Sequence, residues 1–188
     1  MEDLIVQVGE MSKGNAYESQ RLFDFREDIR PIIGNRQVIG TYGQLSFASE
    51  ESAADALQFF TQFMTKLKSE QYAILHSGSL LGIGGIAHKE AKKNNLLTLG
   101  IIPHSTQHIT DLSEFSKVIV EGDDWGDASY LFGGLPDEII FAGGGYWSYL
   151  EYQKAREFDK EIKFLNFKGA RYAKEFDDVT RKETMGTF

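Results

Sequence analysis

The sequence contains no cysteine in its 188 residues, which excludes disulfide bonds and thiolate metal sites. It has no apolar run approaching the roughly 18 residues that span a bilayer. Its N-terminus shows no basic region followed by an apolar stretch, the pattern of a secretory signal. We therefore expect a cytoplasmic protein that has no membrane partner.

Positive charge is in the minority, because 20 lysines and arginines face 28 aspartates and glutamates, for a net charge of -8. A field of that sign repels nucleic acid and anionic membrane surfaces, so we expect no nucleic-acid partner. A site for an anion must then be local, built from backbone amides where helices begin.

Proline is scarce, with 3 residues, whereas the 19 glycines gather where apolar runs end. The apolar runs predict strands at residues 4–8, 37–42, 72–75, 96–102, 117–120, 138–142 and 162–167. Amphipathic or capped segments predict helices at residues 17–33 and 112–115. We predict four more helices: one after the N-cap Ser49, one that ends at about residue 94, a short one that ends at residue 132, and one that follows the glycine triplet and ends at about residue 160.

The order of these elements indicates the fold class. Strands that are apolar without alternation have both faces of their sheet covered. Strands separated by helices are typical of right-handed crossovers in a parallel sheet. We predict a single Rossmann-like α/β domain, doubly wound, with a mostly parallel sheet and helices on both faces. We divide it into an N-terminal extension (1–35), a core (36–168) and a C-terminal tail (169–188).

A glycine-rich loop follows the strand at residues 72–75, at the edge where such sheets bind ligands. Gly82, Gly84 and Ala87 fit the G-x-G-x-x-A dinucleotide pattern, but no acid ends the next strand, which disfavours an NAD-type oxidoreductase. A P-loop is excluded, because no glycine is followed by Lys and then by Ser or Thr. These glycines either permit a tight turn or let amides bind an anion. The candidate anion ligands in this region are Gly43, Ser77, Gly78, Gly82 and Gly84.

A second loop holds three consecutive glycines, Gly143, Gly144 and Gly145. Such a run is costly in unfolded-state entropy, so a ligand or another chain segment should lie close to its backbone. Ser148 and Glu151 have the S-x-x-E spacing of a capping box, which is one interpretation of both. In the other, Ser148 and local amides bind phosphate, and Glu151 serves as an acid, a base or a ribose ligand.

An acidic loop covers residues 121–127. Asp124 and Asp127 either form a solvated turn, with Asp127 capping the next helix, or bind sugar hydroxyls or a divalent metal. His104 and His108 are four residues apart, but the glutamate of an H-E-x-x-H site is missing. We therefore predict no zinc site.

Taken together, these loops resemble the LOG (Lonely Guy) or lysine decarboxylase-like family of the SLOG superfamily, over residues 37–167. The family hallmark is P-G-G-x-G-T-x-x-E, and residues 143–151 read G-G-G-Y-W-S-Y-L-E. Gly144, Gly145 and Glu151 match, and Ser148 replaces the threonine. Trp147 replaces the third glycine of the hallmark.

The resemblance implies hydrolysis of the N-glycosidic bond of nucleoside 5′-monophosphates and dimerisation. We expect a homodimer or higher homo-oligomer and no cofactor. The family's chemistry uses the hallmark glutamate and an arginine from a preceding segment, and residues 124–129 contain no arginine here. Glu151 with Asp124 or Asp127 would then be the catalytic carboxylates. We favour a SLOG-type protein that binds a nucleotide or its derivative, as a sensor without turnover. The alternative is a LOG-like phosphoribohydrolase.

Overall fold

The structure is a computed structural model that describes residues 5–7, 15–107 and 111–176. Its strands are β1 (Ile5–Gln7), β2 (Gln37–Gly43), β3 (Tyr72–Ser77), β4 (Leu97–Ile102), β5 (Lys117–Val120), β6 (Glu138–Ala142) and β7 (Glu161–Phe164). Its helices are α1 (Asn15–Ile33), α2 (Glu50–Met64), α3 (Gly82–Lys93), α4 (Ser129–Gly134) and α5 (Tyr146–Glu157). Short 3₁₀ turns are η2 (His104–Thr106), η3 (Leu112–Glu114) and η4 (Lys174–Phe176).

The strands form one parallel sheet in the order β1-β5-β4-β3-β2-β6-β7. From β2 the chain moves outward through β3, β4 and β5, and then returns to place β6 on the other side of β2. The direction of winding therefore reverses between β2 and β6, which is where doubly wound sheets bind ligands. The predicted Rossmann-like fold is confirmed.

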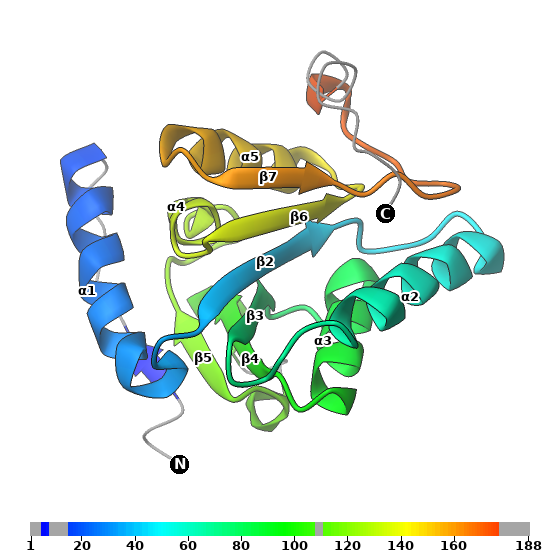
Figure 1. The fold of residues 1–188 in the computed structure, drawn as a ribbon. Coiled ribbons are helices and arrows are strands. Elements are labelled where there is room, and N and C mark those ends of the chain that lie inside the picture. Colours follow the sequence, from blue (N-terminus) through cyan, green and yellow to red (C-terminus); the bar gives the residue numbers. More distant parts are fainter. Residues whose placement is uncertain (1–4, 8–14, 108–110, 177–188) are drawn as a thin grey trace.

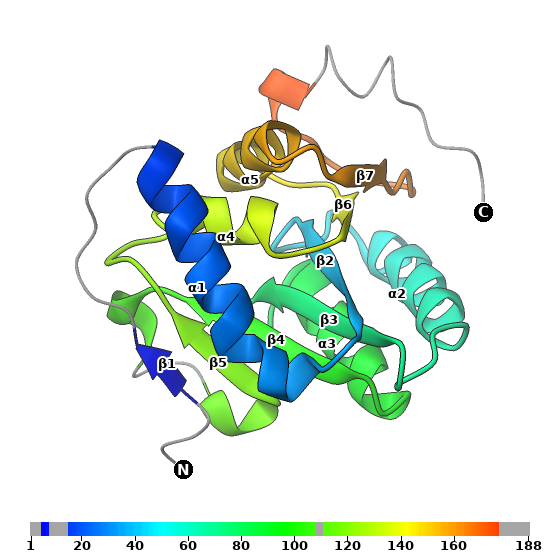
Figure 2. The same cartoon turned by 60° about the vertical axis from the view of Figure 1, so that its left-hand side comes forward.

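Helices cover both faces of the sheet (Figures 1 and 2). On one face, α1, α4 and α5 bury Phe25, Leu131 and Ala155 against the strands. On the other face, α2 and α3 bury Phe60 and Ala87. Each side of the sheet thus has its own apolar layer, which explains why the strands lack an alternating pattern.

The N-terminal extension adds β1 to the sheet edge beside β5, and α1 packs on α4. The predicted N-cap of α2 is also present, because the Ser49 hydroxyl accepts a hydrogen bond from the Ser52 N–H at 3.2 Å. Within the described residues, none of the helices has the length and apolar character needed to cross a membrane.

Candidate functional site

A cavity of about 720 Å³ opens at the carboxyl edge of the sheet, at the point where the winding reverses. The ends of β2 and β3, the starts of α3 and α5, the loop at residues 125–126 and the chain at 171–173 form its walls. It is lined by seven of the predicted site residues, namely Gly43, Ser77, Gly84, Gly144, Gly145, Ser148 and Glu151. The other five do not line it, namely Gly78, Gly82, Gly143, Asp124 and Asp127.

Asp124 and Asp127, the predicted site residues of the acidic loop, do not line the cavity. Asp124 and Asp127 are exposed, and the structure does not bring either to the cavity wall with Glu151. The Asp127 Oδ2 atom accepts the backbone N–H groups of Asp123 and Asp124, both at 3.0 Å. Asp127 caps no helix, because the N-cap of α4 is Ala128. Its carboxylate instead closes its own loop.

The first two glycines of the triplet accommodate another part of the chain. Gly143 and Gly144 have φ angles of 69° and 137°, which side-chain-bearing residues rarely adopt. The Gly144 N–H donates to the Arg171 carbonyl at 2.7 Å, and the Ala173 N–H donates to the Gly144 carbonyl at 2.8 Å. The tail therefore lies along the backbone of Gly144, and a Cβ on Gly143 would meet both the Gln44 side chain and the Arg171 carbonyl of the tail.

Gly145 differs from its neighbours, because a Cβ built on it would meet nothing within 4 Å. Gly145 is the N-cap of α5, so Ser148 lies within the first turn and makes no side-chain cap. The capping-box interpretation of Ser148 and Glu151 is therefore wrong, because the helix begins three residues too early for it. Ser148 and Glu151 both line the cavity, at the helix end whose first N–H groups lack intrahelical partners.

Glu151 is a buried acid, with 8% of its surface exposed, and its carboxyl makes no hydrogen bond to another described residue. Burial raises the pKa of Glu151 to about 8. At neutral pH the carboxyl is therefore mostly protonated and presents both a donor and an acceptor. Burial also raises the pKa of the neighbouring Tyr42, with a further increase from the charge of Glu151. The Tyr42 hydroxyl donates to the Phe132 carbonyl at 2.9 Å.

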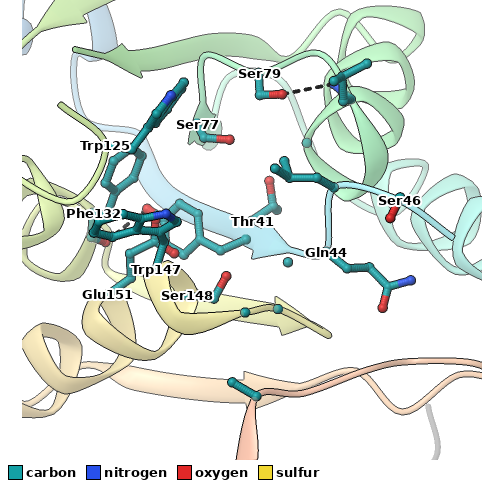
Figure 3. Close-up of a pocket in the computed structure, with 18 of the residues that line it drawn as sticks. Thr41, Gln44, Ser46, Ser77, Ser79, Trp125, Phe132, Trp147, Ser148 and Glu151 are labelled. Atoms are coloured by element: carbon teal, nitrogen blue, oxygen red, sulfur yellow. Dashed lines mark hydrogen bonds between the residues drawn. The ribbon is translucent and has the colours of Figure 1, made fainter.

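Aromatic side chains form the cavity wall beside Glu151. Figure 3 shows Trp125, Phe132 and Trp147 on this side, and Ser77 and Ser79 on a different side. The ring of Trp147 covers Gly126 so closely that a Cβ there would lie 2.2 Å from it. The cavity thus has one aromatic wall and one wall rich in hydroxyl groups.

The mouth of the cavity is also apolar. Leu45, Leu81 and Trp147 are exposed and line the cavity, and the exposed Tyr146 packs edge-on against Trp147 at 5.5 Å between ring centroids. Exposed apolar side chains gathered at one opening are typical of a binding site rather than of an ordinary surface.

Sequence reasoning missed the contribution of the tail. Arg171 lines the cavity, and its backbone N–H donates to the Gln44 Oε1 atom at 2.9 Å. The Tyr172 hydroxyl shares its one proton between the carbonyls of Phe141 at 3.1 Å and Leu165 at 2.8 Å, which fixes the tail across β6 and the chain after β7. In the sequence, the only indication of this packing is the glycine triplet, which predicts that a ligand or another chain segment lies close to its backbone.

A buried histidine pair lies behind Ser77 and does not line the cavity. Burial lowers the pKa of His76 to about 3, so its ring is neutral. His76 donates from Nδ1 to the Ser77 carbonyl, and its Nε2 accepts from the Nδ1 of His88 at 3.0 Å. Within the described residues there is no cluster of three metal-ligating side chains. His108 lies outside them, so the predicted absence of a zinc site remains a prediction.

Comparisons with known proteins establish the fold. The chain matches no family model and no curated protein. One similar structure is a molybdenum cofactor binding protein from Rippkaea orientalis. The match covers 74% of this chain and 90% of that protein, with a TM-score of 0.58 and 22% identity. For a molybdenum cofactor carrier protein from Chlamydomonas reinhardtii, the match covers 73% of this chain and 89% of that protein, with a TM-score of 0.57 and 19% identity. For the structural genomics target TM1055, the match covers 78% of this chain and 81% of that protein, with a TM-score of 0.58 and 15% identity. This chain shares their fold.

Proposed function

We propose that this protein is a divergent SLOG-type protein that binds a phosphorylated, nucleotide-like small molecule in the cavity and does not turn it over. The observation that carries this proposal is that Glu151 is the only acidic residue among the described residues that line the cavity. Glycoside hydrolysis by a carboxylate pair needs a second carboxylate about 5–9.5 Å away. Asp124 and Asp127, the predicted partners, lie outside the cavity.

A phosphate fits the same cavity. Arg171 is the only basic residue among its described lining residues, and its guanidinium would supply the cation that residues 124–129 lack. The N-terminus of α5 adds unpaired N–H groups and the positive end of a helix dipole. Thr41, Ser77 and Ser148 add hydroxyl groups. These groups provide local anion binding in a protein whose net charge is -8.

Two of the structural neighbours support binding rather than turnover, because one binds and the other carries a molybdenum cofactor. That cofactor therefore belongs among the ligands to be tested. The homodimer implied by the LOG resemblance stays a prediction, which light scattering on the purified protein would test.

One observation favours the hydrolase as a second candidate. The Glu151 carboxyl, whose pKa burial raises to about 8, is a proton donor at neutral pH that would serve the departing base. This function would have to proceed without a second carboxylate on the cavity wall.

The two functions separate in one experiment. The protein is titrated with nucleoside 5′-monophosphates and with molybdenum cofactor by calorimetry, and the same mixtures are followed for base release by chromatography. We expect saturable binding without base release. Base release that is lost in Glu151→Ala and kept in the exposed control Glu70→Gln would establish the hydrolase instead. Absence of binding by every ligand would refute the proposal.

A further inference from the structure

The relation between Glu151 and the aromatic wall suggests a role for this acid that differs from catalysis. Trp147 lies four residues before Glu151 on α5, so both side chains share one face of the helix. Tyr42 has a pKa raised first by burial and further by the nearby charge of Glu151, and its ring packs on Phe132 with 5.3 Å between the ring centroids. The carboxyl of Glu151 is thus at the foot of the aromatic wall (Figure 3).

An aromatic wall of this kind favours a flat ring. Trp125, Phe132 and Trp147 all line the same cavity, and Trp147 is held in place over Gly126. Stacking on such side chains is tolerant of the identity of the ring, because every heterocyclic base has a π-face. The wall alone therefore gives affinity for a planar ring, and a polar group is needed at its edge to give selectivity.

We infer that the carboxyl of Glu151 recognises the edge of a planar nitrogen heterocycle that stacks on this wall, at an edge where a ring nitrogen acceptor adjoins an N–H donor. The inference rests on the proposed function and names the part of the ligand that Glu151 contacts. A protonated carboxyl matches that edge, with its O–H donating to the ring nitrogen and its carbonyl oxygen accepting from the N–H. Glu151 is then a binding residue.

The surroundings of Glu151 are consistent with this role. The other titratable groups of the described cavity wall are the hydroxyls of Tyr42 and Tyr172 and the guanidinium of Arg171. The Tyr42 hydroxyl already donates to the Phe132 carbonyl, so the Glu151 carboxyl has no hydrogen-bond partner among the residues that the structure describes. An unpartnered polar group that is buried gains most from a ligand that satisfies it.

The test compares ligands that differ only at the edge of the base. Tryptophan fluorescence follows the binding of adenosine 5′-monophosphate and of two analogues that lack the N–H donor, the purine riboside and the N6,N6-dimethyladenosine 5′-monophosphates. Adenosine monophosphate should bind about tenfold more tightly than either analogue. Its affinity should fall by about tenfold between pH 7.5 and 9.5 as Glu151 ionises, in a range where the phosphate is already fully charged.

Glu151→Gln is the matched variant, because its amide keeps one donor and one acceptor and does not titrate. It should retain the preference for adenosine monophosphate and lose the pH dependence, whereas Glu151→Ala should lose both. Equal affinities for the three ligands would overturn this inference and leave the proposed function standing. A pH dependence that is the same in the wild type and in Glu151→Gln would also overturn it. Absence of binding by all ligands would refute the proposed function itself.

Discussion

Replacing Glu151 by glutamine should stabilise the protein at neutral pH, although it alters a residue of the binding site. Burial raises the pKa of this carboxyl from 4.5 to about 8. Above pH 4.5 the unfolded chain therefore releases the proton while the folded protein retains it, which favours unfolding by about 1.4 kcal/mol per pH unit. This loss in the free energy of unfolding is absent below pH 4.5, reaches about 3 kcal/mol at pH 7 and does not grow further above pH 8. The glutamine amide avoids it, because it carries no charge at any of these pH values.

Urea unfolding followed by circular dichroism, from pH 4.5 to 8.5, measures this difference. At pH 7 the variant should unfold with a free energy about 3 kcal/mol above that of the wild type, which is about 6–12 °C in Tm for a protein of this size. At pH 4.5 the two proteins should be equally stable. Glu70→Gln, an exposed substitution, controls for the loss of a surface carboxylate. A stability difference that is constant over this pH range would refute the reasoning.

Further predictions concern the glycine triplet and the tail. Gly144→Ser should destabilise the protein by about 1–3 kcal/mol, because of its positive φ and the nearby Ser148 side chain. Gly145→Ser, at the open N-cap, should be neutral or stabilising by a few tenths of a kcal/mol, and thermal melts of the two variants would contradict us if their order were reversed. Tyr172→Phe removes two hydrogen bonds and should lower the free energy of urea unfolding by about 1–2 kcal/mol; an unchanged value would show that they contribute little. Arg171→Ala should weaken calorimetric binding of a nucleoside monophosphate about tenfold but leave binding of the nucleoside unchanged, and equal losses for both would exclude a phosphate contact.

Much of the fold followed from the sequence, because apolar runs and helix spacing report burial directly. The runs at residues 117–120 and 138–142 coincide with β5 and β6. The run at residues 162–167 continues beyond β7, which ends at Phe164. Leu165 is buried after the strand, in the layer beneath α2 and α3. An apolar run shows that a segment is buried, but it does not show where its ladder hydrogen bonds end.

The cavity was less predictable, because part of it is made by backbone contacts. The bonds from Gly144 to Arg171 and Ala173 join main-chain atoms, which leave no mark in a residue pattern. The spacing of Ser148 and Glu151 was compatible with two helix starts, and only the backbone at Gly145 distinguishes them. The Asp127 carboxylate bonds within its own loop, an outcome that the same residues allow as readily as a ligand contact.

Two of the places where the sequence departs from the LOG pattern meet at one contact in the structure. Trp147 replaces a hallmark glycine, and its ring packs directly on Gly126, inside the segment 124–129 that lacks the family's arginine. Trp125, Phe132 and Trp147 give the cavity an aromatic surface at this wall. The chain has the aromatic surface, and it retains Glu151 in a buried site that favours the uncharged acid. An aromatic wall beside an uncharged acid is suited to holding a planar ring, and this is the physical support for the proposal of binding without turnover.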